Sequence, residues 1–180
     1  MKVVEHRRHA MRVKPKKHLS QAGVSLARRT GEDMGPFDRV LTSTVPRAFE
    51  TAIAMGFAVD TRAELLSGLG EYVDAELETE NAYGAGYAAF ARVFAQRELT
   101  REFGQELEEL LRNLAESLPE NGQALVVSHG GIVELSAVAC LPDANHSAWG
   151  GPAGYCEGVR LTWEDGGWRD AEILRVPQPA

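Results

Sequence analysis

The sequence predicts an α/β fold built around a mostly parallel sheet. Short apolar runs rich in β-branched residues alternate along the chain with segments of helical periodicity. Two of these runs, Arg39–Ser43 and Ala124–Ser128, lead directly into segments with a helical pattern, as strands do in βα units. With 180 residues, the chain has the length of a single domain that can bury a core without disulfides.

Four segments are predicted to be strands of this sheet: Lys2–Arg8, Arg39–Ser43, Phe57–Asp60 and Ala124–Ser128. The last is the clearest, because it is short and apolar and follows the turn residues Asn121 and Gly122. A hairpin is expected near the end of the chain. Its strands are the alternating segments Gly158–Glu164 and Trp168–Val176, joined by an Asp-Gly-Gly turn.

Helical periodicity fills most of the remaining chain. The strongest amphipathic pattern runs from Thr100 to Leu118, where leucines recur on one stripe and Pro119 ends the helix. Pro46 fits the first turn of a helix that follows the second strand. Two further helices are predicted over Ser20–Arg29, with Ser20 as the N-cap, and over Gly130–Cys140.

Residues 69–97 fit neither pattern, because Tyr, Gly and Ala are mixed there with many carboxylates. We interpret this segment as an excursion from the sheet, a lid or insert within one domain of residues 1–180.

The charge of the chain narrows the classes of function. The formal net charge of −7 disfavours nucleic acids and anionic membranes as partners, since both require a broad basic face. Seven Lys or Arg nevertheless lie within residues 2–17 beside a single acid, Glu5, which indicates a local anion site. No stretch is apolar enough for a signal peptide or a membrane span, so a cytoplasmic protein is expected.

The cysteines and histidines give no sign of a metal site. Cys140 and Cys156 form neither a disulfide framework nor a CxxC motif, and the chain has no HExxH motif. His6 and His9 are three apart on a predicted strand and would point to opposite faces. We therefore expect no metal and no cofactor.

Three segments place polar residues at the end of a predicted strand: residues 8–10, 41–52 and 127–131. In a parallel α/β sheet the carboxyl ends of the strands share one edge, and ligands bind there. We therefore expect four side chains that are distant in sequence to converge, namely Arg8, His9, Arg47 and His129.

The chemistry of these residues suits a phosphate group. Arg8 and Arg47 supply bidentate guanidinium donors, and the turn at Gly130 offers backbone N–H groups where a helix starts. A neutral imidazole can attack phosphorus, and two nearby arginines would keep His9 unprotonated. His129 could then donate a hydrogen bond to the phosphoryl oxygens as charge builds.

The three segments resemble the motifs of the histidine phosphatase superfamily, also called the phosphoglycerate mutase-like family. Arg8-His9-Ala10 is similar to its Arg-His-Gly motif. Residues 42–52 are similar to Ser-Ser-Pro-x-x-Arg-Ala-x-Gln-Thr-Ala, and residues 127–131 match Val-Ser-His-Gly-Gly. The matches occur in the family's order and span nearly the whole chain. The resemblance implies a three-layer sandwich with a mostly parallel central sheet.

The resemblance also implies roles for single residues. His9 would be the phosphorylated nucleophile, in a phosphate site formed by Arg8, Arg47 and His129. Arg12, three residues after His9, would help to bind phosphate, with a surface position as the alternative.

The resemblance further implies a general acid for the leaving oxygen, usually a Glu in the segment after the third strand. Glu71 is predicted for this role, with Asp74 and Glu64 as alternatives. Because some small members of the family lack such an acid, its absence also stays open.

The chain departs from the family pattern in its first strand. Ala10 stands where the motif has glycine, and Glu5, His6 and Arg7 occupy a strand that is apolar in the family. If this strand is buried, its charges must be paired. The mutase pattern after the motif is absent and the chain is short for a glycolytic mutase, so hydrolysis is favoured over transfer.

These observations predict a phosphomonoester hydrolase that acts on a small phosphorylated metabolite through a covalent phosphohistidine on His9. Two alternatives stay open: a phosphatase for phosphohistidine on a partner protein, and a non-catalytic phosphate-binding module. The sequence also leaves open whether the protein forms a homodimer.

Overall fold

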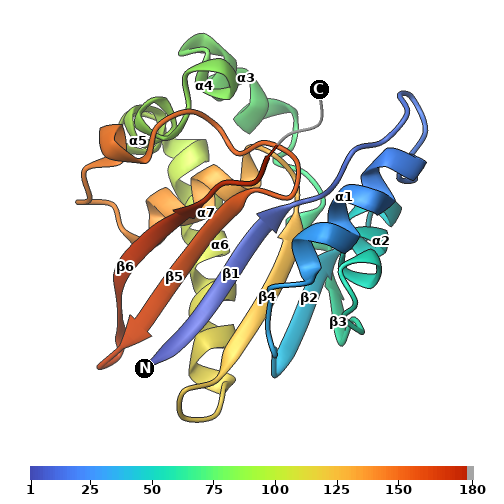
Figure 1. Cartoon of the computed structure of the whole chain (residues 1–180). Coiled ribbons are helices and arrows are strands. Elements are labelled where there is room, and N and C mark those ends of the chain that lie inside the picture. The colour runs from blue at the N-terminus through green and yellow to red at the C-terminus, as the bar shows by residue number, and fades with distance from the viewer. Residues whose placement is uncertain (178–180) are drawn as a thin grey trace.

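The computed structural model describes residues 1–177. Its six-stranded sheet has the order β3-β2-β4-β1-β5-β6 and lies between two layers of helices (Figure 1). β1, β2, β3 and β4 run parallel, and β5 and β6 extend the sheet as an antiparallel hairpin. The predicted α/β sandwich with a mostly parallel sheet is thus confirmed. The strands are β1 (Lys2–Arg8), β2 (Arg39–Ser43), β3 (Thr61–Ala63), β4 (Gln123–Ser128), β5 (Gly158–Glu164) and β6 (Gly167–Leu174).

The helices cover the two faces of the sheet unequally. On one face lie α1 (Gln21–Gly31) and α2 (Pro46–Ala54). On the other lie α5 (Tyr87–Gln96), α6 (Glu98–Ser117) and α7 (Ile132–Cys140), which enclose the larger apolar core. The remaining short elements are η1 (Glu64–Leu66), α3 (Glu71–Thr79), α4 (Ala82–Ala85) and η2 (His146–Trp149). Within residues 1–177, no helix combines the length and the apolar character that crossing a membrane requires.

Most predicted elements are confirmed, but the strand predicted at Phe57–Asp60 is wrong. The main-chain N–H of Asp60 donates to the carbonyl of Val40, and the Asp60 carboxylate accepts from the Val40 N–H. The Asp60 side chain therefore occupies the Val40 N–H that a neighbouring strand would otherwise use. Pairing with β2 begins only at Thr61. The Phe57 ring packs edge-on against Phe37 instead, with ring centroids 4.9 Å apart.

Residues 69–97, which fit neither pattern in the sequence, contain the three helices α3, α4 and α5. In Figure 1, α3 and α4 lie beyond the end of the sheet where β1 and β4 finish. The capping predictions hold on the opposite face. The Ser20 side chain accepts from the Gly23 N–H at the start of α1, and Pro46 occupies the first turn of α2.

The charged residues of β1 are buried and paired. Glu5 is only 2% exposed, and its two carboxylate oxygens bind Arg7 at 3.0 Å and Arg160 at 2.7 Å. Arg160 also binds Glu172, which extends the chain of charges across β5 to β6. These residues share the face of the sheet that carries α1 and α2. The charged residues of β1 are therefore neutralised by each other and by Arg160 of the neighbouring strand β5.

His6 points to the opposite face and is completely buried. Its Nδ1 lies 2.8 Å from Ser136 Oγ and its Nε2 lies 2.6 Å from Ser128 Oγ. Because the Ser136 hydroxyl donates to the carbonyl of Val133, it must accept from His6 Nδ1–H. Burial lowers the pKa of His6 to about 3, so the ring is neutral at ordinary pH and Nε2 accepts from the Ser128 hydroxyl. These two hydrogen bonds link β1, β4 and α7.

Replacing Glu5 with leucine should destabilise the protein strongly, because it leaves the buried Arg7 guanidinium without a counter-charge. We expect the free energy of unfolding to fall by about 3 kcal/mol or more, measured by urea denaturation. The matched control is Glu120→Ala, which breaks an exposed ion pair with the N-terminus and should cost well under about 1 kcal/mol. Similar losses for the two variants would contradict the pairing described for β1.

Candidate active site

The register of β1 with β4 brings the two histidine-bearing strand ends together. Arg8 pairs with Ser128 in the parallel ladder, and the main-chain N–H of His9 donates to the carbonyl of Ser128 at 2.9 Å. His9 and His129 each follow directly, so their ring centroids are 5.1 Å apart. β2 ends beside β4 and leads into α2, whose first turn delivers Arg47 to the same place.

The tautomer of His9 is determined by its hydrogen bonds. Nδ1 lies 2.6 Å from the carbonyl oxygen of Ala10, which can only accept, so Nδ1 carries the proton. Nε2 therefore keeps its lone pair and accepts from Arg47 Nε–H at 3.0 Å. The main-chain N–H of Ala10 is held by the Thr51 hydroxyl, which fixes the position of the carbonyl that orients the ring.

Ala10 fits where the related motif has glycine. Its side chain is completely buried and packs in the cluster that also contains Ala48 and Ala52. The small residues of α2 leave room for the Ala10 methyl group at this position.

His129 is oriented by Ser43. The Ser43 hydroxyl oxygen lies 2.8 Å from His129 Nε2 and also accepts from the Val45 N–H. If the Ser43 O–H donates to Nε2, the proton of His129 resides on Nδ1. Among residues 1–177, this buried Nδ1 has no hydrogen-bond partner, so it can donate to a ligand.

Arg8 is held by the loop that precedes β5. Its Nη1 donates to the carbonyl of Ala153 at 2.9 Å, and its guanidinium lies 4.7 Å from the centre of the Tyr155 ring. Its buried Nε, like His129 Nδ1, has no partner within the described part of the chain. Buried polar atoms without partners are rare in folded proteins, and two of them at one site can bind the oxygens of an anion.

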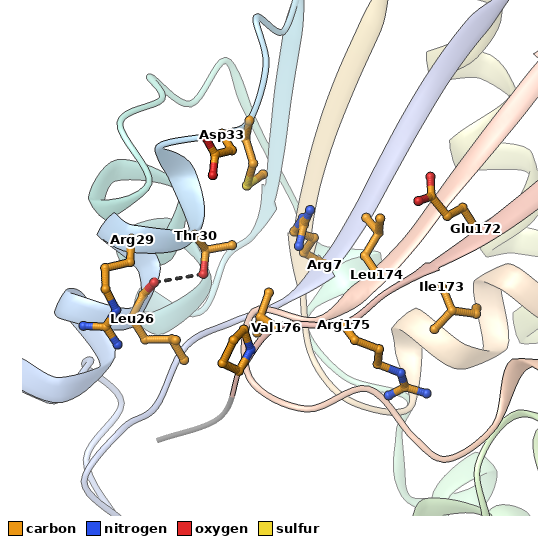
Figure 2. Close-up of a pocket in the computed structure, with 12 residues that line it drawn as sticks. Arg7, Leu26, Arg29, Thr30, Asp33, Glu172, Ile173, Leu174, Arg175 and Val176 are labelled. Atoms are coloured by element: carbon orange, nitrogen blue, oxygen red, sulfur yellow. Dashed lines mark hydrogen bonds between the residues drawn. The ribbon is translucent and has the colours of Figure 1, made fainter. Parts of the chain in front are cut away.

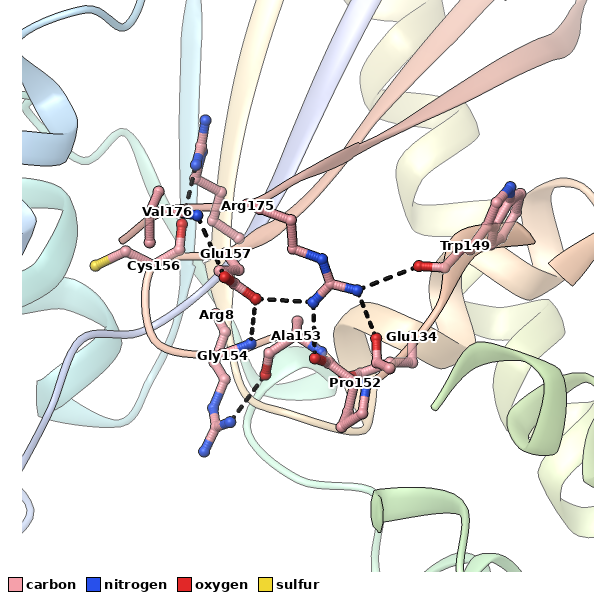
Figure 3. A network of polar contacts seen from close by, with 12 residues as sticks. Arg8, Glu134, Trp149, Pro152, Ala153, Gly154, Cys156, Glu157, Arg175 and Val176 are labelled. Atoms are coloured by element: carbon pink, nitrogen blue, oxygen red, sulfur yellow. Dashed lines mark hydrogen bonds and ion pairs between the residues drawn. The ribbon is translucent and has the colours of Figure 1, made fainter. Parts of the chain in front are cut away.

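A polar network fixes this loop (Figure 3). Arg175 donates to the carbonyls of Trp149, Gly151 and Pro152 and also binds the Glu157 carboxylate at 2.8 Å. Glu134 of α7 also holds the loop, because its carboxylate accepts from the main-chain N–H groups of Gly131 and Ala153. The Ala153 carbonyl that holds Arg8 is thus set by residues from α7 and from the chain after β6.

A cavity of about 320 Å³ opens at this edge of the sheet. It brings together the sequence-predicted residues Arg8, His9, Arg12, Arg47, His129 and Gly130. Glu71 does not line the cavity, because it lies in the first turn of α3 and is exposed. Its alternatives Asp74 and Glu64 do not line the cavity either: Asp74 accepts from the Tyr83 hydroxyl, and Glu64 accepts from Thr44.

Several lining residues were not predicted from the sequence. They are Lys14, Tyr83, Glu134, Pro152, Ala153 and Tyr155, whereas Gly131 lies in the predicted segment 127–131. Tyr83 has helical spacing with Tyr87 and Phe90, a pattern typical of core packing, and its ring contacts Phe90. The loop at 152–155 carries no motif, so only the fold reveals that it borders the site. Of these residues, only Lys14 had a signal in the sequence, because it belongs to the basic run within residues 2–17 that indicated an anion site.

Both site histidines are neutral near physiological pH. Burial lowers the pKa of His9 to about 3, with further lowering by His129, Arg47 and Arg8 and partial opposition from the Ala10 carbonyl. Burial also lowers the pKa of His129 to about 3, followed by the charges of Arg47 and Arg8. The arginines do lower the pKa of His9, as the sequence predicted, but desolvation by burial lowers it more.

A second cavity, of about 720 Å³, lies between α1 and the end of β6 (Figure 2). Three of its charged groups are already paired: Arg7 binds Glu5 and the carbonyl of Cys156, Arg175 binds Glu157, and Glu172 binds Arg160. Its lining contains no histidine, so it lacks the pair of imidazoles found in the site around His9. Within the described residues, no three His, Cys, Asp or Glu side chains are placed to hold a metal ion.

Comparison with known proteins agrees with this geometry. A sequence profile of the histidine phosphatase superfamily (branch 1) matches residues 4–173. No curated protein matches the chain in sequence.

Solved structures resemble the whole fold at low sequence identity. Phosphoserine phosphatase from Entamoeba histolytica has a TM-score of 0.70 at 16% identity, and the likeness covers 98% of each chain. Phosphoglycerate mutase from Bacillus anthracis has a TM-score of 0.66 at 18% identity, covering 96% of this chain and 92% of the other. A mycobacterial glucosyl-3-phosphoglycerate phosphatase has a TM-score of 0.64 at 20% identity, covering 96% and 97%.

Stability should decline as the pH falls from about 7.5 to about 5.5. The folded pKa of His6, like those of His9 and His129, is lowered to about 3, whereas an unfolded histidine titrates near about 6.5. The unfolded chain therefore binds more protons over this interval, and acid favours unfolding. Urea denaturation at several pH values measures the effect. His6→Asn should show a shallower decline, and a wild-type curve that stays flat would contradict the three neutral imidazoles.

Proposed function

The chain belongs to branch 1 of the histidine phosphatase superfamily, and on that basis we propose that it hydrolyses phosphomonoesters through a covalent phosphohistidine on His9. The observation that carries the proposal is the state of the His9 ring. Nε2 bears a lone pair, faces Arg47 at 3.0 Å and belongs to an imidazole that stays neutral well below pH 7. It is the nucleophile that such a reaction requires.

The surrounding donors suit the transferred group. Arg8 and Arg47 present guanidinium N–H groups, and His129 Nδ1 and Arg8 Nε are buried without protein acceptors among the described residues. A phosphoryl group bound next to His9 Nε2, in place of the hydrogen bond from Arg47, would accept hydrogen bonds from these donors. Charge-assisted hydrogen bonds of this kind strengthen as negative charge spreads over the equatorial oxygens.

The reaction has two steps. In the first, the lone pair of His9 Nε2 forms a bond to phosphorus while the bond to the leaving oxygen breaks, and the leaving oxygen then takes up a proton from solvent to give the alcohol. In the second, a water oxygen attacks phosphorus and gives up a proton to solvent, the phosphorus–nitrogen bond breaks and Nε2 regains its lone pair. Inorganic phosphate leaves with the water oxygen. The Nδ1–H bond to Ala10 holds the ring in the same tautomer throughout.

A small phosphorylated metabolite is the proposed substrate. The cavity of about 320 Å³ is at the small end for ligand sites, and its lining includes Tyr83 from α4 and Tyr155 from the loop before β5. Two of the structural neighbours are phosphatases whose names specify small substrates, phosphoserine and glucosyl-3-phosphoglycerate. These points support hydrolysis of a metabolite over action on a phosphorylated protein.

The cavity offers no free carboxyl group for the leaving oxygen. Among the residues that line it, Glu134 is the sole carboxyl, and its two oxygens already accept from Gly131 and Ala153. The Tyr83 hydroxyl holds its proton firmly, because burial and then Asp74 raise its pKa. We therefore propose that the first step relies on the leaving group itself, and Glu71 remains the sequence-based alternative.

His9→Ala should lower phosphate release from an aryl phosphate by at least about a thousandfold, on the scale seen when other enzyme nucleophiles are removed. After rapid acid-free denaturation with labelled substrate, wild type should retain label on the protein and the variant should not. His18→Ala is the matched control, because His18 is exposed and outside the cavity. Activity without a labelled intermediate would contradict the covalent route, and neither activity nor label would favour a binding module.

The dependence of kcat/KM on the leaving group should be steep. In a series from nitrophenyl to alkyl phosphates, the rate should fall sharply as the pKa of the leaving alcohol rises, because no free carboxyl lines the cavity. Glu71→Gln and Asp74→Asn should leave this slope unchanged. A shallow slope that steepens in Glu71→Gln would instead identify Glu71 as the general acid.

A further inference from the structure

The site carries more positive charge than one phosphoryl group needs. Four basic residues line the cavity: Arg8, Arg12, Lys14 and Arg47. None of them forms an ion pair with any carboxylate of residues 1–177. In a protein with a net charge of −7 and 26 acidic residues, four unpaired cations around one cavity are a built feature rather than a consequence of composition.

The acids near the cavity do not offset this charge. Glu134 is the one carboxyl in its lining, and it is committed to two main-chain N–H groups. The cations also repel one another: the pKa of Arg47 is lowered by burial, then by Arg12 and then by Arg8. Holding these groups together costs free energy that a bound anion would recover.

The four cations divide into an inner and an outer pair. Arg47 touches His9 and Arg8 precedes it, so these two adjoin the atom that is transferred. Arg12 and Lys14 lie on the loop between β1 and α1, which is closed by a β-bridge between Arg12 and Leu19 and by a bond from Arg12 Nη1 to the Lys16 carbonyl. Lys14 is exposed, whereas His9 is 5% exposed.

The direction of the reaction assigns the outer pair to the leaving group. In-line attack places the leaving oxygen on the side of phosphorus opposite His9 Nε2, away from the buried His9 ring and toward the more exposed lining residues such as Lys14. A dianionic phosphoryl group is matched by the two inner guanidinium groups and the two imidazoles. The charge of Lys14, with that of Arg12, is left for another part of the substrate.

We propose that Lys14, supported by Arg12, is a specificity residue that binds a second anionic group on the leaving portion of the substrate. The substrate class is then phosphorylated metabolites that carry an additional carboxylate or phosphate. This inference rests on the proposed function for the location of the transferred phosphoryl group, but it concerns binding rather than turnover.

Calorimetric binding to the His9→Ala variant tests it without turnover. Two matched pairs separate the chemistry of the second group: glycerol 3-phosphate against 3-phosphoglycerate for a carboxylate, and fructose 6-phosphate against fructose 1,6-bisphosphate for a phosphate. We expect the doubly anionic member of at least one pair to bind about fivefold more tightly or better. Adding Lys14→Met should reduce that preference to below about twofold.

Lys17→Met is the matched control, because it removes the same charge from the same exposed loop and Lys17 does not line the cavity. The preference should persist in this variant. Equal affinities within both pairs, a preference that survives Lys14→Met, or equal losses in the two lysine variants would each overturn the inference.

Phosphate release by the wild-type protein separates this inference from the proposed function. If wild type releases phosphate with equal kcat/KM for both members of each pair, the function stands and the role of Lys14 is overturned. If the doubly anionic compounds bind with the expected preference but no phosphate is released from any of the four, the anion site stands and hydrolysis is overturned.

Discussion

The parallel pairing of β1 with β4 is the constraint on which the site depends. It aligns Arg8 with Ser128 and fixes His9 to the carbonyl of Ser128, so two imidazoles separated by 120 positions (129 minus 9) stand side by side. His6 reinforces the same pairing from behind through Ser128 and Ser136. A slip of one residue would turn both the charged and the apolar residues of β1 to the wrong faces of the sheet.

Burial and charge act in the same direction at this edge. Desolvation keeps His9 and His129 neutral, and the guanidinium groups that would receive a phosphoryl group also disfavour a proton on either ring. The free protein therefore holds uncompensated positive charge beside two neutral bases. Such a site is poised for a multiply charged anion, and the Ala10 and Ser43 contacts orient the rings before any ligand arrives.

The sequence was informative where function follows strand ends. Arg8, His9, Arg47 and His129 could be grouped because each follows a recognisable strand, and strand ends of a parallel sheet share an edge. Tyr155 and Ala153 could not, since their loop is positioned by long-range bonds from Arg175. The third strand was also placed wrongly because of a contact between distant residues. The Asp60 carboxylate accepts from the Val40 N–H, a donor that a strand prediction would pair with a main-chain carbonyl.

The Arg175 network has a consequence for which parts of the chain set the geometry of the site. The Ala153 carbonyl positions Arg8, and the loop that carries it is fastened by Glu134 in α7 and by a residue that follows β6. A change after the last strand of the sheet can therefore loosen a guanidinium group in the cavity without touching β1, β2 or β4.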